Sequence, residues 1–235
     1  MELRYAHDYL ERLAAQLGSA GVPTKFVARV GDPARIIVGT AQNEGCGLIL
    51  MTTRGGSKIK RWAIGGVTEK VLRLSPIPVL VLRGRSNQGG KIPRIIVPVD
   101  GSKLAETSVP WTLPLAKHFK AKIAFLHVYP AGPVGLRTWH QARFEAISRR
   151  MTQMCRDLQK KGHRATFHVE SGDPADRILA YAGPDDLILT TTHGAGGFKR
   201  WLFGSVAEKL IHEATVPVLV YKAAAHASAV AKKPA

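Results

Sequence analysis

The sequence predicts an α/β protein built from two copies of one parallel-sheet unit. First, short apolar runs alternate with helical stretches along the chain, the order typical of parallel strands joined by covering helices. Second, Thr52-Thr53-Arg54-Gly55 returns as Thr191-Thr192-His193-Gly194, at an offset of 139 residues from Gly55 to Gly194. Third, both copies close in the same kind of apolar run, at 77–81 and 216–220.

Composition limits the class of protein. The chain has 235 residues, 45% of them hydrophobic, which is enough for two ordinary domains. Its formal net charge of +17 would attract phosphate groups non-specifically. However, Lys and Arg are scattered over both copies, and no motif of a known nucleic-acid-binding fold is recognised, so no specific nucleic-acid function is predicted. No apolar run reaches the roughly 20 residues that cross a bilayer, and no signal peptide is visible. We therefore expect a cytoplasmic protein that does not bind membranes.

The second copy is complete, and its first elements can be placed in order. Residues 94–100 form an almost uninterrupted apolar run, as in a buried parallel strand. A helix is predicted over 101–119, with Ser102 as its N-cap, although two internal prolines should bend or shorten it. A second strand is predicted over 122–129.

A long amphipathic helix comes next in the second copy and opens the first copy. Its apolar residues follow the i, i+3, i+4, i+7 spacing that packs one stripe against a sheet. They are Phe144, Ile147, Met151, Met154, Cys155 and Leu158 in the second copy, and Leu3, Ala6, Leu10, Leu13, Ala14 and Leu17 in the first. We expect third strands around 26–28 and 167–169.

Each of these third strands ends in Gly-Asp-Pro-Ala. Asp32 and Asp173 fit as helix N-caps with proline at the first helical position, so they are interpreted as caps and not as catalytic groups. The next strands, 48–51 and 187–190, lead into the repeated glycine loops. Asp185-Asp186, at the start of the second of these strands, is interpreted as a solvated turn.

The glycine loops are the candidate ligand site. In doubly wound parallel sheets, ligands collect beyond the carboxyl ends of the strands, where the strand order reverses. Asp100, the turn at 191–194 and the helix start at Gly204 all fall at that edge, and bare backbone N–H groups there suit a phosphate. Ser205, with Glu208, also fits a capping box, and capping alone would explain it.

The first copy is incomplete, because Met1 aligns with Ala142 and nothing corresponds to residues 94–141. Gaps one strand wide in the sheet would leave buried backbone N–H and C=O groups of the neighbouring strands without hydrogen-bond partners. We expect either a truncated form of a two-domain protein or a second chain that fills the gap. The predicted organisation is a partial domain at 1–84, a linker at 85–93, a complete domain at 94–223 and a disordered basic tail at 224–235.

Together these motifs resemble the universal stress protein (UspA) family, specifically its tandem-domain members. The resemblance rests on Val97-Pro98-Val99-Asp100-Gly101-Ser102, both Gly-Asp-Pro helix starts, the Thr-His-Gly turn, Gly-Ser nine residues later and the closing Pro-Val-Leu-Val. It implies two Rossmann-like domains of the adenine nucleotide alpha hydrolase type, of which the first lacks its first two strands.

The resemblance also implies an ATP site in the second domain, where ATP could bind with or without Mg²⁺. Asp100 would meet the ribose, and Pro98, Val99 and Val128 would flank the adenine. His193 would contact a phosphate or stabilise its turn. The remaining residues of the predicted site lie around the phosphates: Thr190, Thr191, Gly194, Gly204, Ser205 and Val206.

Two departures from the family pattern bear on this expectation. Thr191 replaces the first glycine of the loop, and its β-branched side chain adds bulk, although its hydroxyl could donate to a phosphate. The first copy ends its loop in Gly65-Gly66, without a hydroxyl, and has no counterpart of Asp100. We therefore expect nucleotide in the second domain only.

The predicted function is a stress-response protein that binds adenine nucleotide and acts through association with a partner that the sequence does not identify. The last strands, 79–82 and 218–221, are suited to pair within the chain as a pseudo-dimer, or between chains as a homodimer. One alternative is an interaction module that binds no nucleotide. Another is a weak ATPase or autophosphorylating protein, although no catalytic residues and no metal site are specified.

Overall fold

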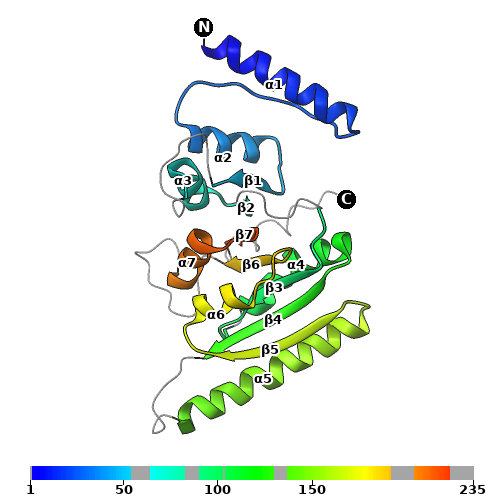
Figure 1. The fold of residues 1–235 in the computed structure, drawn as a ribbon, viewed down its shortest axis with the longest axis vertical. Coiled ribbons are helices and arrows are strands. Elements are labelled where there is room, and N and C mark those ends of the chain that lie inside the picture. Colours follow the sequence, from blue (N-terminus) through cyan, green and yellow to red (C-terminus); the bar gives the residue numbers. More distant parts are fainter. Residues whose placement is uncertain are drawn as a thin grey trace.

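The computed structural model describes residues 2–53, 64–82, 90–102, 104–129, 137–191 and 204–222. Its strands form one mostly parallel sheet in the order β1-β2-β7-β6-β3-β4-β5 (Figure 1). The strands are β1 Ile49–Thr52, β2 Val79–Leu82, β3 Arg94–Pro98, β4 Lys122–Tyr129, β5 Ala165–Ser171, β6 Leu187–Thr191 and β7 Val218–Tyr221. The helices are α1 Glu2–Ser19, α2 Pro33–Asn43, α3 Gly66–Leu74, α4 Leu104–Phe119, α5 Arg137–Lys160, α6 Pro174–Tyr181 and α7 Ser205–Glu213.

The second copy has the predicted doubly wound arrangement. Its five strands lie in the order β7-β6-β3-β4-β5, and every neighbouring pair among them is parallel. The chain runs outward from β3 through β4 to β5, then crosses back to β6 and β7. The order therefore reverses between β3 and β6, which are hydrogen-bonded neighbours. The α/β fold class is confirmed.

The two copies join through their last strands. β2 pairs with β7 in antiparallel register, with Val79 opposite Val220 and Val81 opposite Val218. The Nζ of Lys222 adds a polar contact by donating to the carbonyl of Arg73, in the last turn of α3, at 2.8 Å. The predicted pairing within the chain is therefore present, while the predicted domain boundaries stay a prediction.

Helices cover the two faces of the sheet as layers. Along β3, Ile95 and Val97 pack in the same core cluster as α4 and α5, while Ile96 packs in the cluster that holds α2, α3, α6 and α7. This alternation is the period of a strand buried on both faces. None of the described helices is long and apolar enough to span a bilayer.

The prolines do not shorten α4, so that part of the prediction is wrong, while the predicted bend stays a prediction. The helix runs from Leu104 to Phe119 and includes Pro110 and Pro114. Both proline rings are exposed, whereas Ser108, Thr112 and Ala116 are buried on the packed side. The rings therefore leave the buried stripe of the helix intact.

The first copy departs from the prediction in two ways. Residues 22–30 form no strand, so the strand predicted around 26–28 is wrong. Helix α1 forms, but Leu13 and Leu17 on its apolar stripe are each 39% exposed, so the predicted packing against a sheet is also wrong. The cause is the missing strand–helix–strand segment, because a strand at 22–30 has no neighbour to pair with and α1 has no sheet face to cover.

The missing segment also leaves β1 at the edge of the sheet. Leu50 is 60% exposed, whereas its counterpart in the second copy, Leu189, is 1% exposed beneath the α4–α5 layer. Among the large hydrophobic side chains that are exposed in the described part of the chain, all except Tyr129 belong to the first copy. Exposed apolar surface is therefore concentrated in the incomplete half.

Candidate functional site

The turn after β3 holds Asp100 at the carboxyl edge of the sheet. The Asp100 carboxylate accepts hydrogen bonds from the backbone N–H of Ser102 at 2.9 Å and from its hydroxyl at 2.5 Å. Gly101 has φ +80°, and a Cβ there would lie 2.3 Å from the Cδ1 of Ile147 on α5. Only glycine fits this approach. The described part of α4 begins at Leu104, and residue 103 lies outside the described residues, so Ser102 as the N-cap stays a prediction.

Three apolar site residues lie at neighbouring strand ends. Pro98 is half-buried and stands opposite Leu126 on β4. Val99 is buried, and its carbonyl contacts the buried Nδ1 of His127 at 2.8 Å. Val128 is half-buried near the end of β4. The structure thus places the three residues proposed to flank adenine on, or directly after, two adjacent strands.

Strand β6 brings two threonines to the same edge. Thr190 is buried, and Thr191 is the last residue of the strand, opposite Tyr221. The hydroxyl of Thr191 is buried and has no hydrogen-bond partner among the described residues. A buried hydroxyl without a partner costs free energy, so a bound group that accepts its hydrogen bond would recover that cost.

Helix α7 begins beside these strands, and its start differs from the prediction. Gly204 is the N-cap residue, with φ −66° and ψ 151°, and Ser205 is already the first helical residue. The capping box is therefore wrong, because Ser205 lies one position too far into the helix. Ser205 is exposed, while Val206 is half-buried against the core. His193 and Gly194 lie outside the described residues.

Tyr221 is a neighbour of this edge that the sequence analysis missed. Burial raises its pKa, a hydrogen bond with Thr107 at 3.3 Å lowers it, and the charge of Asp100 raises it. Its counterpart in the first copy is Leu82. The last strands of the two copies are otherwise similar, so the tyrosine at this position was the sequence signal that could have identified it.

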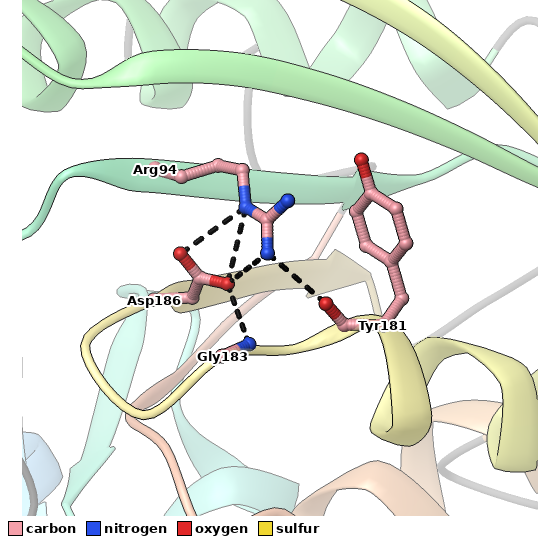
Figure 2. A network of polar contacts seen from close by, with 4 residues as sticks. All are labelled: Arg94, Tyr181, Gly183 and Asp186. Carbon is pink, nitrogen blue, oxygen red and sulfur yellow. Dashed lines mark hydrogen bonds and ion pairs between the residues drawn. The ribbon is translucent and has the colours of Figure 1, made fainter.

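The opposite edge of the sheet holds a second polar arrangement, shown in Figure 2. Asp186 has a side chain only 5% exposed and forms an ion pair with Arg94 at 2.5 Å. It also accepts from the backbone N–H of Gly183 at 2.7 Å, while Arg94 donates to the carbonyl of Tyr181 at 3.0 Å. The solvated turn predicted for Asp186 is wrong, because its buried carboxylate bonds to the Arg94 guanidinium and to the Gly183 N–H within the fold. Asp185 beside it is exposed.

The Arg94–Asp186 pair ties the two strands at the switch point together. Hydrogen bonding to Asp186 raises the pKa of Arg94, whose guanidinium also lies 4.5 Å from the centroid of the Tyr181 ring. The first copy has Gly47 in place of Asp186 and no residue in place of Arg94.

The two aspartates predicted as caps are confirmed in that role. Asp32 accepts from the N–H of Arg35, and Asp173 accepts from the N–H of Asp176, each at 3.0 Å. A hydrogen bond from Lys70 is the main cause that lowers the pKa of Asp32, and the Asp176 N–H is the main cause that lowers that of Asp173. Both carboxylates are therefore engaged by helix amides.

Comparison with known proteins gives a consistent result. The sequence model of the Universal stress protein family matches residues 1–83 and 91–222. A universal stress protein of Mycolicibacterium smegmatis is 25% identical over 232 residues, which cover 93% of this chain and 76% of that protein. Universal stress protein MJ0531 of Methanocaldococcus jannaschii is 31% identical over 166 residues, which cover 66% of this chain and 96% of that protein.

A solved structure agrees with the sequence comparison. The crystal structure of a universal stress protein from Archaeoglobus fulgidus matches with a TM-score of 0.70 at 26% identity. The match covers 93% of this chain and 76% of that one. The similarity therefore extends over both copies and over the junction between them.

Proposed function

The chain belongs to the universal stress protein family, and from that premise we propose that its second copy binds an adenine nucleotide at the edge formed by Asp100, Thr191 and Gly204. The observation that carries the proposal is the convergence of three features at the switch point. Asp100 follows β3, Thr191 ends the adjacent strand β6, and the N-terminus of α7 begins at Gly204. In sheets of this topology the switch point is where nucleotides bind.

The chemistry of these groups fits a nucleotide. The first N–H groups of α7 follow a glycine N-cap, whose lack of a side chain leaves room for phosphate oxygens. The buried hydroxyl of Thr191, without a partner among the described residues, has a donor to offer. Asp100 would accept from a ribose hydroxyl, with adenine against Pro98, Val99 and Val128. Mg²⁺, where present, would arrive with the phosphates.

The proposal confines the nucleotide to the second copy. In the first copy, the hydroxyl of Thr68 donates to the carbonyl of Thr52 at 3.0 Å, and the N–H of Gly65 donates to the carbonyl of Thr53 at 3.0 Å. These bonds hold the α3 start against the end of β1. None of the described residues of the first copy aligns with Asp100.

We further propose that the protein acts through association, with nucleotide occupancy altering the surface that a partner meets. Identification of the protein partner would follow from capture experiments compared with and without nucleotide.

Calorimetric titration with ATP and Mg²⁺ tests the proposal directly. The wild-type chain should bind one nucleotide, and Thr191→Val should bind it about tenfold more weakly, because the variant keeps the shape and loses one hydrogen bond. Thr52→Val is the matched control in the first copy and should bind as wild type does. Absence of heat and of a thermal shift at millimolar nucleotide would remove the nucleotide from the function.

The free protein provides a second readout for the same variant. Because the Thr191 hydroxyl has no partner among the described residues, Thr191→Val should unfold at the same temperature as wild type or higher. A large loss of stability would mean that the hydroxyl has a structural role, and that its effect on nucleotide binding is indirect.

A further inference from the structure

A cluster of exposed cations lies at the amino ends of β3, β4 and β5. Four segments contribute to it: the chain before β3, the end of α4 with the start of β4, the end of α5, and the start of β5. Every member has an exposed side chain. We call this set the basic edge, and its members are Lys91, Lys117, Lys120, Lys122, Lys160, Lys161 and Arg164.

Backbone hydrogen bonds hold these segments side by side. The N–H of Lys122 donates to the carbonyl of Pro93 at 2.9 Å, and the N–H of Ile123 donates to the carbonyl of Arg164 at 2.7 Å. The guanidinium of Arg164 in turn donates to the carbonyl of Lys120. The starts of three adjacent strands therefore present their cations in a row, with neighbouring strands about 4.8 Å apart.

The turn after α5 brings its lysines to the same place. The N–H of Gly162 donates to the carbonyl of Gln159 at 2.9 Å, and the Gln159 side chain donates to the carbonyl of Ala165 at 2.7 Å. This turn fixes Lys160 and Lys161 beside the start of β5. Figure 1 shows the end of α5 on the same side of the sheet as the end of α4.

Within the described part of the chain, the cations of the basic edge are not neutralised by carboxylates, although Arg164 donates to the carbonyl of Lys120. No member forms an ion pair with a described carboxylate, although seven other ion pairs in the described part of the chain engage Lys25, Lys70, Arg73, Arg94, Arg149 and, twice, Lys209. The exposed carboxylates on neighbouring turns are Asp157 and Asp185. The edge therefore keeps an excess of positive charge, and surface cations without partners attract polyanions.

The surroundings of the basic edge indicate the kind of polyanion. No large hydrophobic side chain is exposed among its described neighbours, whereas a membrane-binding surface inserts such side chains beside its cations. Single-stranded nucleic acid is held by exposed aromatic side chains that stack on bases, and Phe119 here is half-buried. A rigid row of cations without either feature suits the phosphate backbone of a duplex, which carries about one charge per 1.7 Å of axis.

We propose that the basic edge binds duplex nucleic acid through its phosphate backbone, without sequence preference. This site lies at the amino ends of β3–β5, whereas Asp100 and Thr191 lie at the carboxyl ends of their strands. The proposal therefore does not depend on nucleotide binding. We expect the contacts to go to phosphates and to carry no base readout.

Fluorescence anisotropy with a labelled mixed-sequence duplex of about 20 base pairs tests this, measured from roughly 50 to 200 mM KCl. If all seven cations meet phosphates, the logarithm of the association constant should fall against the logarithm of salt with a slope of about −6. Lys160→Gln combined with Lys161→Gln should reduce that slope by about 2. Lys117→Gln combined with Lys120→Gln should give the same change from a different segment.

Arg4→Gln combined with Arg29→Gln is the matched control, since both arginines are exposed in the first copy and the formal charge of +17 falls by the same two units. The control should leave the slope unchanged. An equal loss in the control would show that net charge alone attracts the duplex, and the basic edge would be rejected as a site. Absence of binding at the lowest salt, or binding to phosphatidylserine vesicles and not to the duplex, would also overturn the proposal.

Discussion

Replacement of Asp186 by asparagine tests the interpretation of the buried pair at the switch point. Asparagine keeps a carbonyl oxygen for the N–H of Gly183 but loses the charge that pairs with Arg94. Removal of one partner from a fully buried pair costs about 3–5 kcal/mol, whereas an exposed pair contributes about 0–1 kcal/mol. Because the Arg94 side chain is 30% exposed, water will rehydrate it in part. We expect a loss of about 2–3 kcal/mol.

Urea unfolding, followed by circular dichroism, gives the free energy for the variant. Asp185→Asn is the matched control, because Asp185 is the exposed neighbour, and it should change stability by less than about 0.5 kcal/mol. A double-mutant cycle with Arg94→Met should show a coupling of about 1 kcal/mol or more. Additive effects, or a cost for Asp186→Asn as small as that of the control, would show that the pair contributes nothing to stability.

Three further predictions concern other parts of the fold. Gly101→Ala should cost about 2 kcal/mol or more in urea unfolding, because its Cβ would meet the α5 side chain above it, whereas Gly90→Ala, also at positive φ but in open space, should cost about 1 kcal/mol. Asp173→Asn should lower the unfolding temperature at neutral pH; since the folded pKa lies below the usual 3.8, this difference should disappear as the pH falls through that lower value. Burial raises the pKa of Cys155 to about 11, so a maleimide at pH 7 should label the exposed Cys46 alone in the folded chain and both thiols after denaturation.

The elements that the sequence predicted well are those with strong local signals. The apolar run at β3, the paired last strands and the Asp-Pro helix starts each combine composition with a stop or start residue, and each is present. The errors in the first copy have one common physical cause, which is that the periodicity of a segment does not reveal its neighbours. Helix α1 has the same stripe as α5, yet only α5 has a sheet face to cover.

The candidate site was likewise predicted only in part. Position along the strands predicted that Asp100, Thr191 and Gly204 would meet at one edge, because parallel topology carries strand ends to the same place. Sequence could not predict which polar groups are buried without partners, since the state of the Thr191 hydroxyl depends on side chains from other strands. Asp186 was misread for the same reason, because its partner Arg94 lies 92 residues away.

The antiparallel pairing of β2 with β7 determines where two ligands can bind relative to each other. It reverses strand direction midway across the sheet, so the carboxyl ends of β1 and β2 share a flank with the amino ends of β3, β4 and β5. A small ligand held on one flank and a long polymer lying along the other would never touch. Coupling between the two ligands would pass through the elements that run from one flank to the other, which include β3, β4 and α4.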